Sequence, residues 1–270
     1  MLNSSALERI DERGWRNGFA NMLRKESRAW WGTHRWLTQS ILWVLIVNGF
    51  MAFVLFVLPS LVRLDPTVNP EEMDFITIAL QSIFQVGTIG LAIGAIILAQ
   101  DLVIGERQSG VTGWILSKPV SRTAYILSKL VANVAGILVI MVGLPSVVGY
   151  GLLTATAGEP YPLLPYLIGV GGLALHTLFF LTLTLMMGVL VGSRSQVLGV
   201  AMGVLFGGQI LAGFIDKLAR LTPWLLPAIL PTAASGATLP LPVSIPLLAT
   251  AVWSVIFVAA ALYKFERLEF

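Results

Sequence analysis

The sequence contains no cysteine and only two histidines, His34 and His176. The absence of cysteine excludes disulfides, thiolate catalysis and cysteine-ligated metal sites. Two histidines are too few for a histidine-rich metal centre. The dipeptide Gly-Lys is absent as well, so the chain has no phosphate-binding loop of the Gly-x-x-x-x-Gly-Lys-Ser/Thr type and cannot bind ATP by that route. We therefore expect no catalytic residue, no metal and no cofactor on this chain.

Charge is also scarce, because charged residues make up only 11% of the sequence and hydrophobic residues 56%, with a mean hydropathy of +0.85. A soluble fold of 270 residues could not cover its surface with so few charges. The apolar residues gather into six runs, each long enough to cross about 30 Å of hydrocarbon as a helix. The predicted spans are 39–59, 75–99, 126–152, 165–191, 197–215 and 243–263. The sequence thus predicts an all-α polytopic membrane protein with six transmembrane helices.

The basic residues indicate how the spans are oriented. One side of the predicted topology carries Arg9, Arg13, Arg16, Arg24, Lys25, Arg28, Arg35, Arg107, Lys118, Arg122, Lys129, Arg194, Lys264 and Arg267. The other side carries only Arg63, Lys217 and Arg220. The positive-inside rule therefore predicts that both termini are cytoplasmic, and we expect a multi-pass protein of a prokaryotic plasma (inner) membrane. The net charge of +3 reflects this topology, so we expect no binding to nucleic acid.

Two domains follow from this division, a cytoplasmic segment over residues 1–37 and the membrane domain over 38–270. Within the first, residues 15–37 predict an amphipathic helix lying on lipid headgroups, with a bend at Gly32 into the first span. Its apolar half gathers Trp15, Phe19, Met22, Leu23, Ala29, Trp30, Trp36 and Leu37, and its basic half Arg16, Arg24, Lys25, Arg28 and Arg35. Two residues depart from this pattern, because Glu26 falls on the apolar half and Trp31 on the basic half. A basic, Trp-rich anchor that only fixes topology is the alternative.

The predicted cytoplasmic loop over residues 101–123 is longer than two neighbouring spans need. Ser109 is placed to cap a short helix in which Val111, Trp114 and Ile115 recur at helical spacing. Pro119 ends that helix. The pattern suits a rigid knob for a soluble partner, or a loop that only satisfies its own polar groups.

On the other side of the membrane, residues 216–243 are too apolar for a solvated loop and too rich in proline for a span. The prolines are Pro223, Pro227, Pro231, Pro240 and Pro242. We expect two short re-entrant helices packed against protein, or alternatively a loop resting on the headgroups.

Polar residues inside the predicted spans are few. Gln81 and Gln85 lie one turn apart on one helix face, and with His176 they are candidates for a transport pathway. Asn48, Asn133 and Gln209 are the others, and interhelical hydrogen bonding is the alternative for all six. No acidic residue lies inside a predicted span, which argues against a proton- or sodium-driven carrier.

The cytoplasmic loop resembles that of the membrane permeases of type-2 ABC (ATP-binding cassette) exporters. The family pattern is a Glu, a Gly-Thr pair, and then Leu-Ser-Lys/Arg-Pro-Val-Ser-Arg before the third span. The matching residues here are Glu106, Gly110, Leu116, Ser117, Lys118, Pro119, Val120, Ser121 and Arg122, with Val111 in place of the usual Thr. Arg24-Lys25-Glu26 is similar to the Arg-Lys-Glu that precedes the first span in this family. Six spans, cytoplasmic termini and a broken apolar segment before the last span match over nearly the whole chain.

The resemblance implies an exporter permease that dimerises with a second copy or a close relative, surrounded by membrane lipid. It implies two cytoplasmic ATPase subunits as partners, which bind the ATP and Mg²⁺, so the permease is not an enzyme by itself. The loop would be the coupling helix, with ATPase contacts at Glu106, Gly110, Trp114, Ser117, Pro119 and Arg122. Arg24, Lys25 and Glu26 would belong to the connecting helix beside the ATPase. The alternative function is a membrane scaffold or mechanotransmitter that passes ATPase motion to an outer-face accessory protein.

Overall fold

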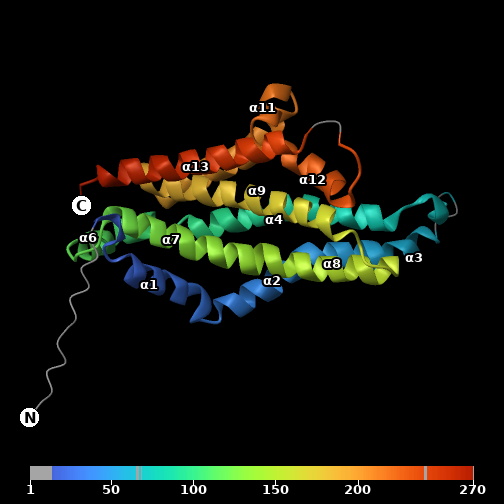
Figure 1. Ribbon diagram of the computed structural model, residues 1–270, viewed down its shortest axis with the longest axis horizontal. Helices are drawn as coiled ribbons and strands as arrows, with labels where there is room; N and C mark the ends of the chain where they lie inside the picture. The colour runs from blue at the N-terminus through green and yellow to red at the C-terminus, as the bar shows by residue number, and fades with distance from the viewer. Residues whose placement is uncertain (1–13, 65–66, 68, 240–241, 270) are drawn as a thin grey trace, which may run out of the picture.

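The computed structural model describes residues 14–64, 67, 69–239 and 242–269 and shows an elongated bundle of helices (Figure 1). No strand occurs in this described part of the chain. Arg9, Arg13 and Pro240 lie outside the described residues. The helices are α1 (Phe19–Trp31), α2 (Arg35–Ala52), α3 (Leu58–Val62), α4 (Phe75–Ala99), α5 (Ile104–Gln108), α6 (Val111–Leu116), α7 (Arg122–Gly136), α8 (Leu144–Ala157), α9 (Leu163–Leu190), α10 (Arg194–Ala212), α11 (Asp216–Arg220), α12 (Leu226–Ser235) and α13 (Ser244–Glu266).

Six helical stretches are long and apolar enough to cross a membrane, as the sequence predicts. They are Arg35–Val62, Phe75–Gln108, Arg122–Ala157, Leu163–Leu190, Arg194–Ala212 and Ser244–Glu266. Each overlaps one predicted span, and the first three extend well beyond the predicted limits. The third of them, Arg122–Ala157, has 36 residues. At about 1.5 Å per residue it is about 54 Å long, which exceeds the hydrocarbon thickness of about 30 Å.

The first and third spans each contain a π-helical segment, Phe53–Val57 and Ile137–Gly143. Each segment ends directly before the same tripeptide, Leu-Pro-Ser, at 58–60 and 144–146. Proline has no N–H to donate and its ring crowds the preceding turn, so a wider turn relieves the clash. The sequence pattern therefore explains why both helices widen at this point. The two helices pack against each other through α2 and α8 (Figure 1).

Helix α9 is the central element, since it packs against α13, α12, α4 and α10. The close approach of α12 depends on glycine: a Cβ on Gly172 would lie 2.2 Å from Leu230, and one on Gly169 would lie 2.6 Å from Ala234. Both Leu230 and Ala234 are fully buried. This packing gives α12 the protein contacts that re-entrant backbone requires.

The proline-rich segment after α10 forms short helical pieces, as its broken apolar pattern predicts: α11, a 3-10 turn at Pro223–Leu225, and α12. Gly208 on α10 allows close packing of this segment, because a Cβ there would lie 1.9 Å from the Trp224 ring. The Trp224 indole N–H donates to the Val204 carbonyl at 3.2 Å. Whether α11 and α12 are re-entrant or interfacial stays a prediction.

The amphipathic segment is shorter than the expected helix over 15–37. A 3-10 turn at Gly14–Arg16 precedes α1, and the chain bends after Gly32 before α2 begins at Arg35. Trp36 and Leu37 therefore belong to the first span. The buried residues of α1 are Met22, Glu26 and Trp30, one turn apart, and this face packs on α7.

Candidate functional site

The residues of the loop motif lie at the end of the bundle where α5 and α6 join α4 to α7 (Figure 1). Ser109 does not cap α6, contrary to the sequence prediction. It ends α5, where its hydroxyl donates to the Gly105 carbonyl at 2.8 Å. Gly110, with φ of 74°, supplies the left-handed residue that allows α6 to start in a new direction.

The N-terminal segment is bonded directly to the end of the motif. The Ser121 hydroxyl donates to the Trp15 carbonyl at 2.6 Å and accepts from the Ala124 amide at 3.0 Å, capping α7. The Ser121 amide donates to the Asn17 carbonyl at 3.0 Å. Gly18 packs so closely on Val120 that a Cβ would lie 2.8 Å from its Cγ2 atom. The motif and the approach to α1 thus form one folded unit.

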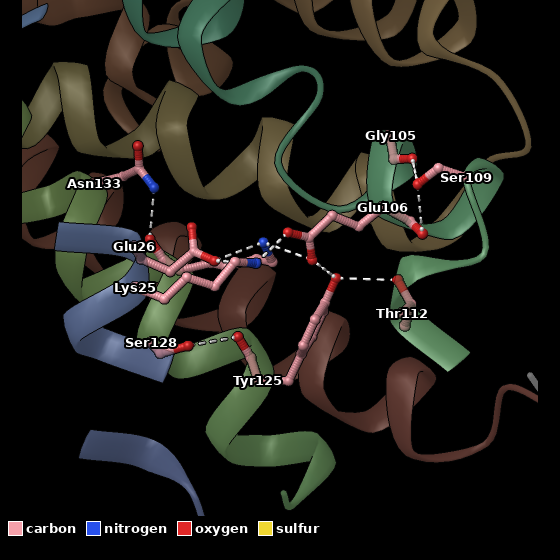
Figure 2. Close-up of polar contacts among 10 residues, drawn as sticks. Lys25, Glu26, Gly105, Glu106, Ser109, Thr112, Tyr125, Ser128 and Asn133 are labelled. Atoms are coloured by element: carbon pink, nitrogen blue, oxygen red, sulfur yellow. Dashed lines mark hydrogen bonds and ion pairs between the residues drawn. The ribbon is translucent and has the colours of Figure 1, made fainter. Parts of the chain in front are cut away.

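Glu106 is the centre of a charge cluster formed by α1, α5 and α7 (Figure 2). Its Oε1 atom lies 2.6 Å from Lys25 Nζ, and its Oε2 atom lies 3.0 Å from Lys129 Nζ. Glu26 Oε1 lies 3.0 Å from Lys129 Nζ and 3.3 Å from Lys25 Nζ. Two carboxylates and two ammonium groups therefore balance each other. This balance is required because the Lys129 side chain is only 2% exposed, and an isolated buried charge is very costly.

The lysine at the edge of this cluster responds to its neighbours. Burial alone would lower the pKa of Lys25, but its hydrogen bond to Glu106 and the charges of Glu106 and Glu26 outweigh that effect and raise it. Lys25 therefore stays charged, and its salt bridge holds α1 to α5 at neutral pH.

Tyr125 connects the charge cluster to α6 through Thr112 (Figure 2), and also to α13. Its hydroxyl donates to Glu106 Oε2 at 2.6 Å and lies 3.1 Å from the Thr112 hydroxyl on α6. Its ring is stacked on Phe265 near the end of α13, with centroids 5.1 Å apart and planes at 3°. Through this one residue α5, α6, α7 and α13 share contacts.

Two arginines of the loop bind the carbonyl ends of spanning helices. Arg107 Nη1 donates to the carbonyls of Gly188, Val189 and Val191 at 2.9–3.2 Å, at the end of α9. Arg122 Nη1 donates to the carbonyls of Phe265, Glu266 and Leu268 at 2.5–3.2 Å, at the end of α13. Unpaired carbonyls and the helix dipole both favour a cation at a helix C-terminus. The loop is therefore attached to the fourth and sixth spans as well.

The outward surface of the loop is formed by α6 and the residues after it. Trp114 is 63% exposed, and Lys118 Nζ lies 3.4 Å above its ring, a cation–π contact. Beside it lies a groove of about 390 Å³ between α6 and the start of α1. Its lining combines apolar groups such as Met22 and Ile115 with the basic residues Lys25 and Lys118. The surface suits a partner that offers an apolar side chain next to a carboxylate.

The structure divides the six predicted ATPase contacts into two groups. Gly110, Trp114, Ser117 and Pro119 are exposed on the outward surface. Glu106 and Arg122 instead make the inward contacts described above. Of the predicted connecting-helix residues, Arg24 is exposed, whereas Lys25 and Glu26 belong to the charge cluster.

The predicted pathway residues do not share one surface. Gln81 and Gln85 are exposed on one face of α4 together with Ile89. His176 is buried in α9 beside Phe180, with ring centroids 5.2 Å apart, and its Nδ1 atom has no hydrogen-bond partner among the described residues. The two glutamines thus remain together as candidates, and His176 lies apart from them inside the bundle.

Sequence reasoning missed Lys129, Tyr125, Thr112 and Arg107 as members of the site. One signal was available: Glu26 lies on the apolar half of its helix, and Lys129 lies inside a predicted span. Two opposite charges in apolar surroundings indicate a buried pair. Among the residues that the structure describes, no group of three or more potential metal ligands occurs.

The comparison with protein families agrees with this architecture. The family model described as "ABC-2 family transporter protein" matches residues 25–270, from Lys25 in the charge cluster to the last residue. No curated protein matches the chain. The match covers all six apolar spans and the loop motif, and a chain of this kind is the membrane permease component of an ABC transporter. The protein belongs to the ABC-2 transporter family.

Proposed function

We propose that this chain is the permease subunit of an ATP-driven exporter and that it works as a dimer with two separate ATPase subunits. The observation that carries the proposal is the combination of an exposed aromatic knob, Trp114, with a loop bonded to three spanning helices, α7, α9 and α13. The family match supports a permease. ATP and Mg²⁺ would bind to the cytoplasmic partner subunits. The permease itself would lie in the plasma membrane of a prokaryote.

The contacts of the loop suggest how force would pass from an ATPase to the membrane. A push on α6 reaches α7 through Thr112 and Tyr125, and reaches α13 through the Tyr125–Phe265 stack. Arg107 and Arg122 attach the ends of the loop to α9 and α13. Because these contacts are short and most are at least partly buried, they would move the spans as the loop moves.

The groove beside Trp114 would receive the ATPase. Lys118 lines it and lies outside the charge cluster, so a carboxylate on the ATPase would bind Lys118 while an apolar side chain fills the groove. In this proposal Glu106 and Arg122 position the loop and do not contact the ATPase.

A dimer would cover two features that lipid covers poorly. Gly199, Gly203 and Gly207 recur every four residues on α10, and a Cβ on any of them would meet no atom within 4 Å. Such a small-residue stripe lets two membrane helices approach closely. The exposed glutamines Gln81 and Gln85 on α4 would then line a polar route between the copies, since polar side chains in spans normally face protein or water.

The test is ATP hydrolysis and cargo export measured together in vesicles that contain the permease and its ATPase. We expect Trp114→Ala and Lys118→Glu each to reduce export per ATP hydrolysed by about tenfold, because both act on the docking surface. Leu164→Ala is the control, since Leu164 is also exposed and lies at the end of α9 that is far from the loop. Unchanged coupling in both loop variants would contradict the proposal.

A second function is favoured by the length of the third span, which at 36 residues extends beyond the hydrocarbon. Here the permease would transmit ATPase motion to an accessory protein on the outer face without moving a cargo. Residues 216–243 would be the docking surface, and Phe214 just before α11 is 84% exposed. In that case loop variants would uncouple the ATPase, but substitutions at Gln81 and Gln85 would have no effect.

A further inference from the structure

A groove of about 750 Å³ lies between α13 and the segment around α11. Its volume is within the range of about 300–1,000 Å³ that is typical of small-molecule sites. On α13 the lining residues follow one stripe: Ile245, Leu248, Ala249, Val252, Trp253 and Ile256. The Trp253 indole N–H donates to the Leu221 carbonyl at 3.0 Å, which fixes the two walls relative to each other. The groove is thus a built, almost wholly apolar surface.

The length of this stripe matches one leaflet of a membrane. From Ile245 to Ile256 the helix rises by about 16 Å, at about 1.5 Å per residue. Half of a hydrocarbon core of about 30 Å is about 15 Å. An acyl chain that lies along the stripe would therefore extend over the depth of a single leaflet.

Two basic residues lie at or beside this groove. Lys217 is the charged residue that lines the groove, and Arg220 lines a small neighbouring cavity that shares Ile245 with it. Neither side chain forms a salt bridge within the described part of the chain, and Asp216 is not a lining residue. In the predicted topology this side of the membrane has only one other basic residue, Arg63. Two of these three residues therefore lie at this groove or at the small cavity beside it.

We propose that this groove binds an anionic phospholipid, with one acyl chain along the α13 stripe and the phosphate bound by Lys217. An acyl chain explains the apolar lining and its length, and a phosphate explains the cation at the rim. The inference goes beyond the proposed function and does not depend on coupling to an ATPase.

The experiment is native mass spectrometry of the full chain titrated with phosphatidylglycerol or with phosphatidylcholine of the same acyl chains. We expect phosphatidylglycerol to bind more tightly. Lys217→Gln should weaken its binding about fivefold, the effect of one basic residue near anionic lipid, and leave phosphatidylcholine unchanged. Lys217→Arg should retain the binding, and Arg63→Gln, which changes a cation outside the groove, should have no effect.

A second pair of variants tests the apolar part of the site. Ala249→Phe fills the groove without changing charge and should weaken the binding of both lipids. Its control is Ala251→Phe on the same helix, because Ala251 lines a different groove, formed with α7 and α9. Inorganic phosphate should not displace the lipid, since it lacks the chain.

Three results would overturn the proposal. The first is equal binding of the two lipids together with no effect of Lys217→Gln. The second is displacement of the lipid by inorganic phosphate alone. The third is a photo-crosslinker at Leu248 that reacts with a second copy of the chain or with an accessory protein instead of with lipid.

Discussion

Lys129 on α7 and Glu26 on α1 lie 3.0 Å apart, nitrogen to oxygen, although 103 residues separate them in the sequence. Both side chains are almost fully buried, and Trp30 one turn along α1 donates to Asn133 one turn along α7 at 3.0 Å. Gly136 completes the contact, since a Cβ there would lie 2.3 Å from the Trp30 ring. The face of α1 that a helical wheel assigns to lipid is therefore a protein contact that carries an ion pair.

Removal of Lys129 should be strongly destabilising. Lys129→Met leaves Glu26 and Glu106 without their shared cation, and loss of one partner of a buried pair typically costs about 3–5 kcal/mol. The double variant Lys129→Met/Glu26→Met should lose much less than the sum of the single changes, because the remaining Lys25–Glu106 pair is balanced. Thermal unfolding in detergent measures both. Additive losses would show that the two residues do not interact.

The Tyr125 hydroxyl should matter for coupling as well as for stability. Tyr125→Phe removes the hydrogen bond to Glu106 and the link to Thr112, which should cost about 1–2 kcal/mol and lower export per ATP hydrolysed. Tyr166→Phe is the control, because it also removes a tyrosine hydroxyl that donates a hydrogen bond, here to the Ser146 carbonyl. An equal effect of both variants on coupling would remove the special role of Tyr125.

A substitution at Arg122 distinguishes two roles of this residue, its hydrogen bonds to the end of α13 and a direct contact with the ATPase. Arg122→Gln should expose the carbonyls at the end of α13, so amide hydrogen exchange around residues 262–268 should become faster. The affinity for the ATPase should then fall only as far as the faster exchange shows that the end of α13 has loosened. If exchange is unchanged while ATPase affinity falls, Arg122 contacts the ATPase as the loop motif predicts.

Asp74 should make the start of α4 sensitive to pH. Its carboxylate accepts from the Thr77 hydroxyl at 2.6 Å and from the Ile76 and Thr77 amides at 3.1 Å. These bonds, that of the Thr77 hydroxyl first, lower the pKa of Asp74 below its ordinary value. The stabilisation is therefore fully present above the unfolded pKa of about 3.9 and is lost as pH falls through the lower folded pKa.

Two variants check this cap by thermal unfolding in detergent between neutral and acidic pH. Asp74→Ala should cost about 0.5–2 kcal/mol at neutral pH, the usual effect of losing an N-cap. Asp74→Asn keeps a capping oxygen but cannot titrate, so it should remove the acid-dependent part alone. A wild-type acid profile in Asp74→Asn would rule out Asp74 as its source.

The spans could be predicted because length and apolarity decide them locally. The short helical pieces after α10 were also expected from the prolines there, although Pro227 and Pro231 lie within α12 and do not break it. The site could not be predicted from the sequence, because its contacts depend on which helix ends lie next to each other in the folded bundle. Arg107 and Arg122 look like ordinary positive-inside residues in the sequence, and only the packed bundle brings the ends of α9 and α13 to them. Glu26 and Lys129 were visible as exceptions to their patterns, but pairing them required knowing that α1 packs on α7.

The central claim is that the outward surface of the loop, and not its charge cluster, binds the ATPase. A photo-crosslinking amino acid in place of Trp114, in cells that express the full chain, tests it directly, with the same substitution at Leu164 as control. We predict a crosslink from position 114 to a protein that carries a phosphate-binding loop, and none from position 164. Crosslinks from position 114 to lipid alone, or to no ATPase, would contradict the account.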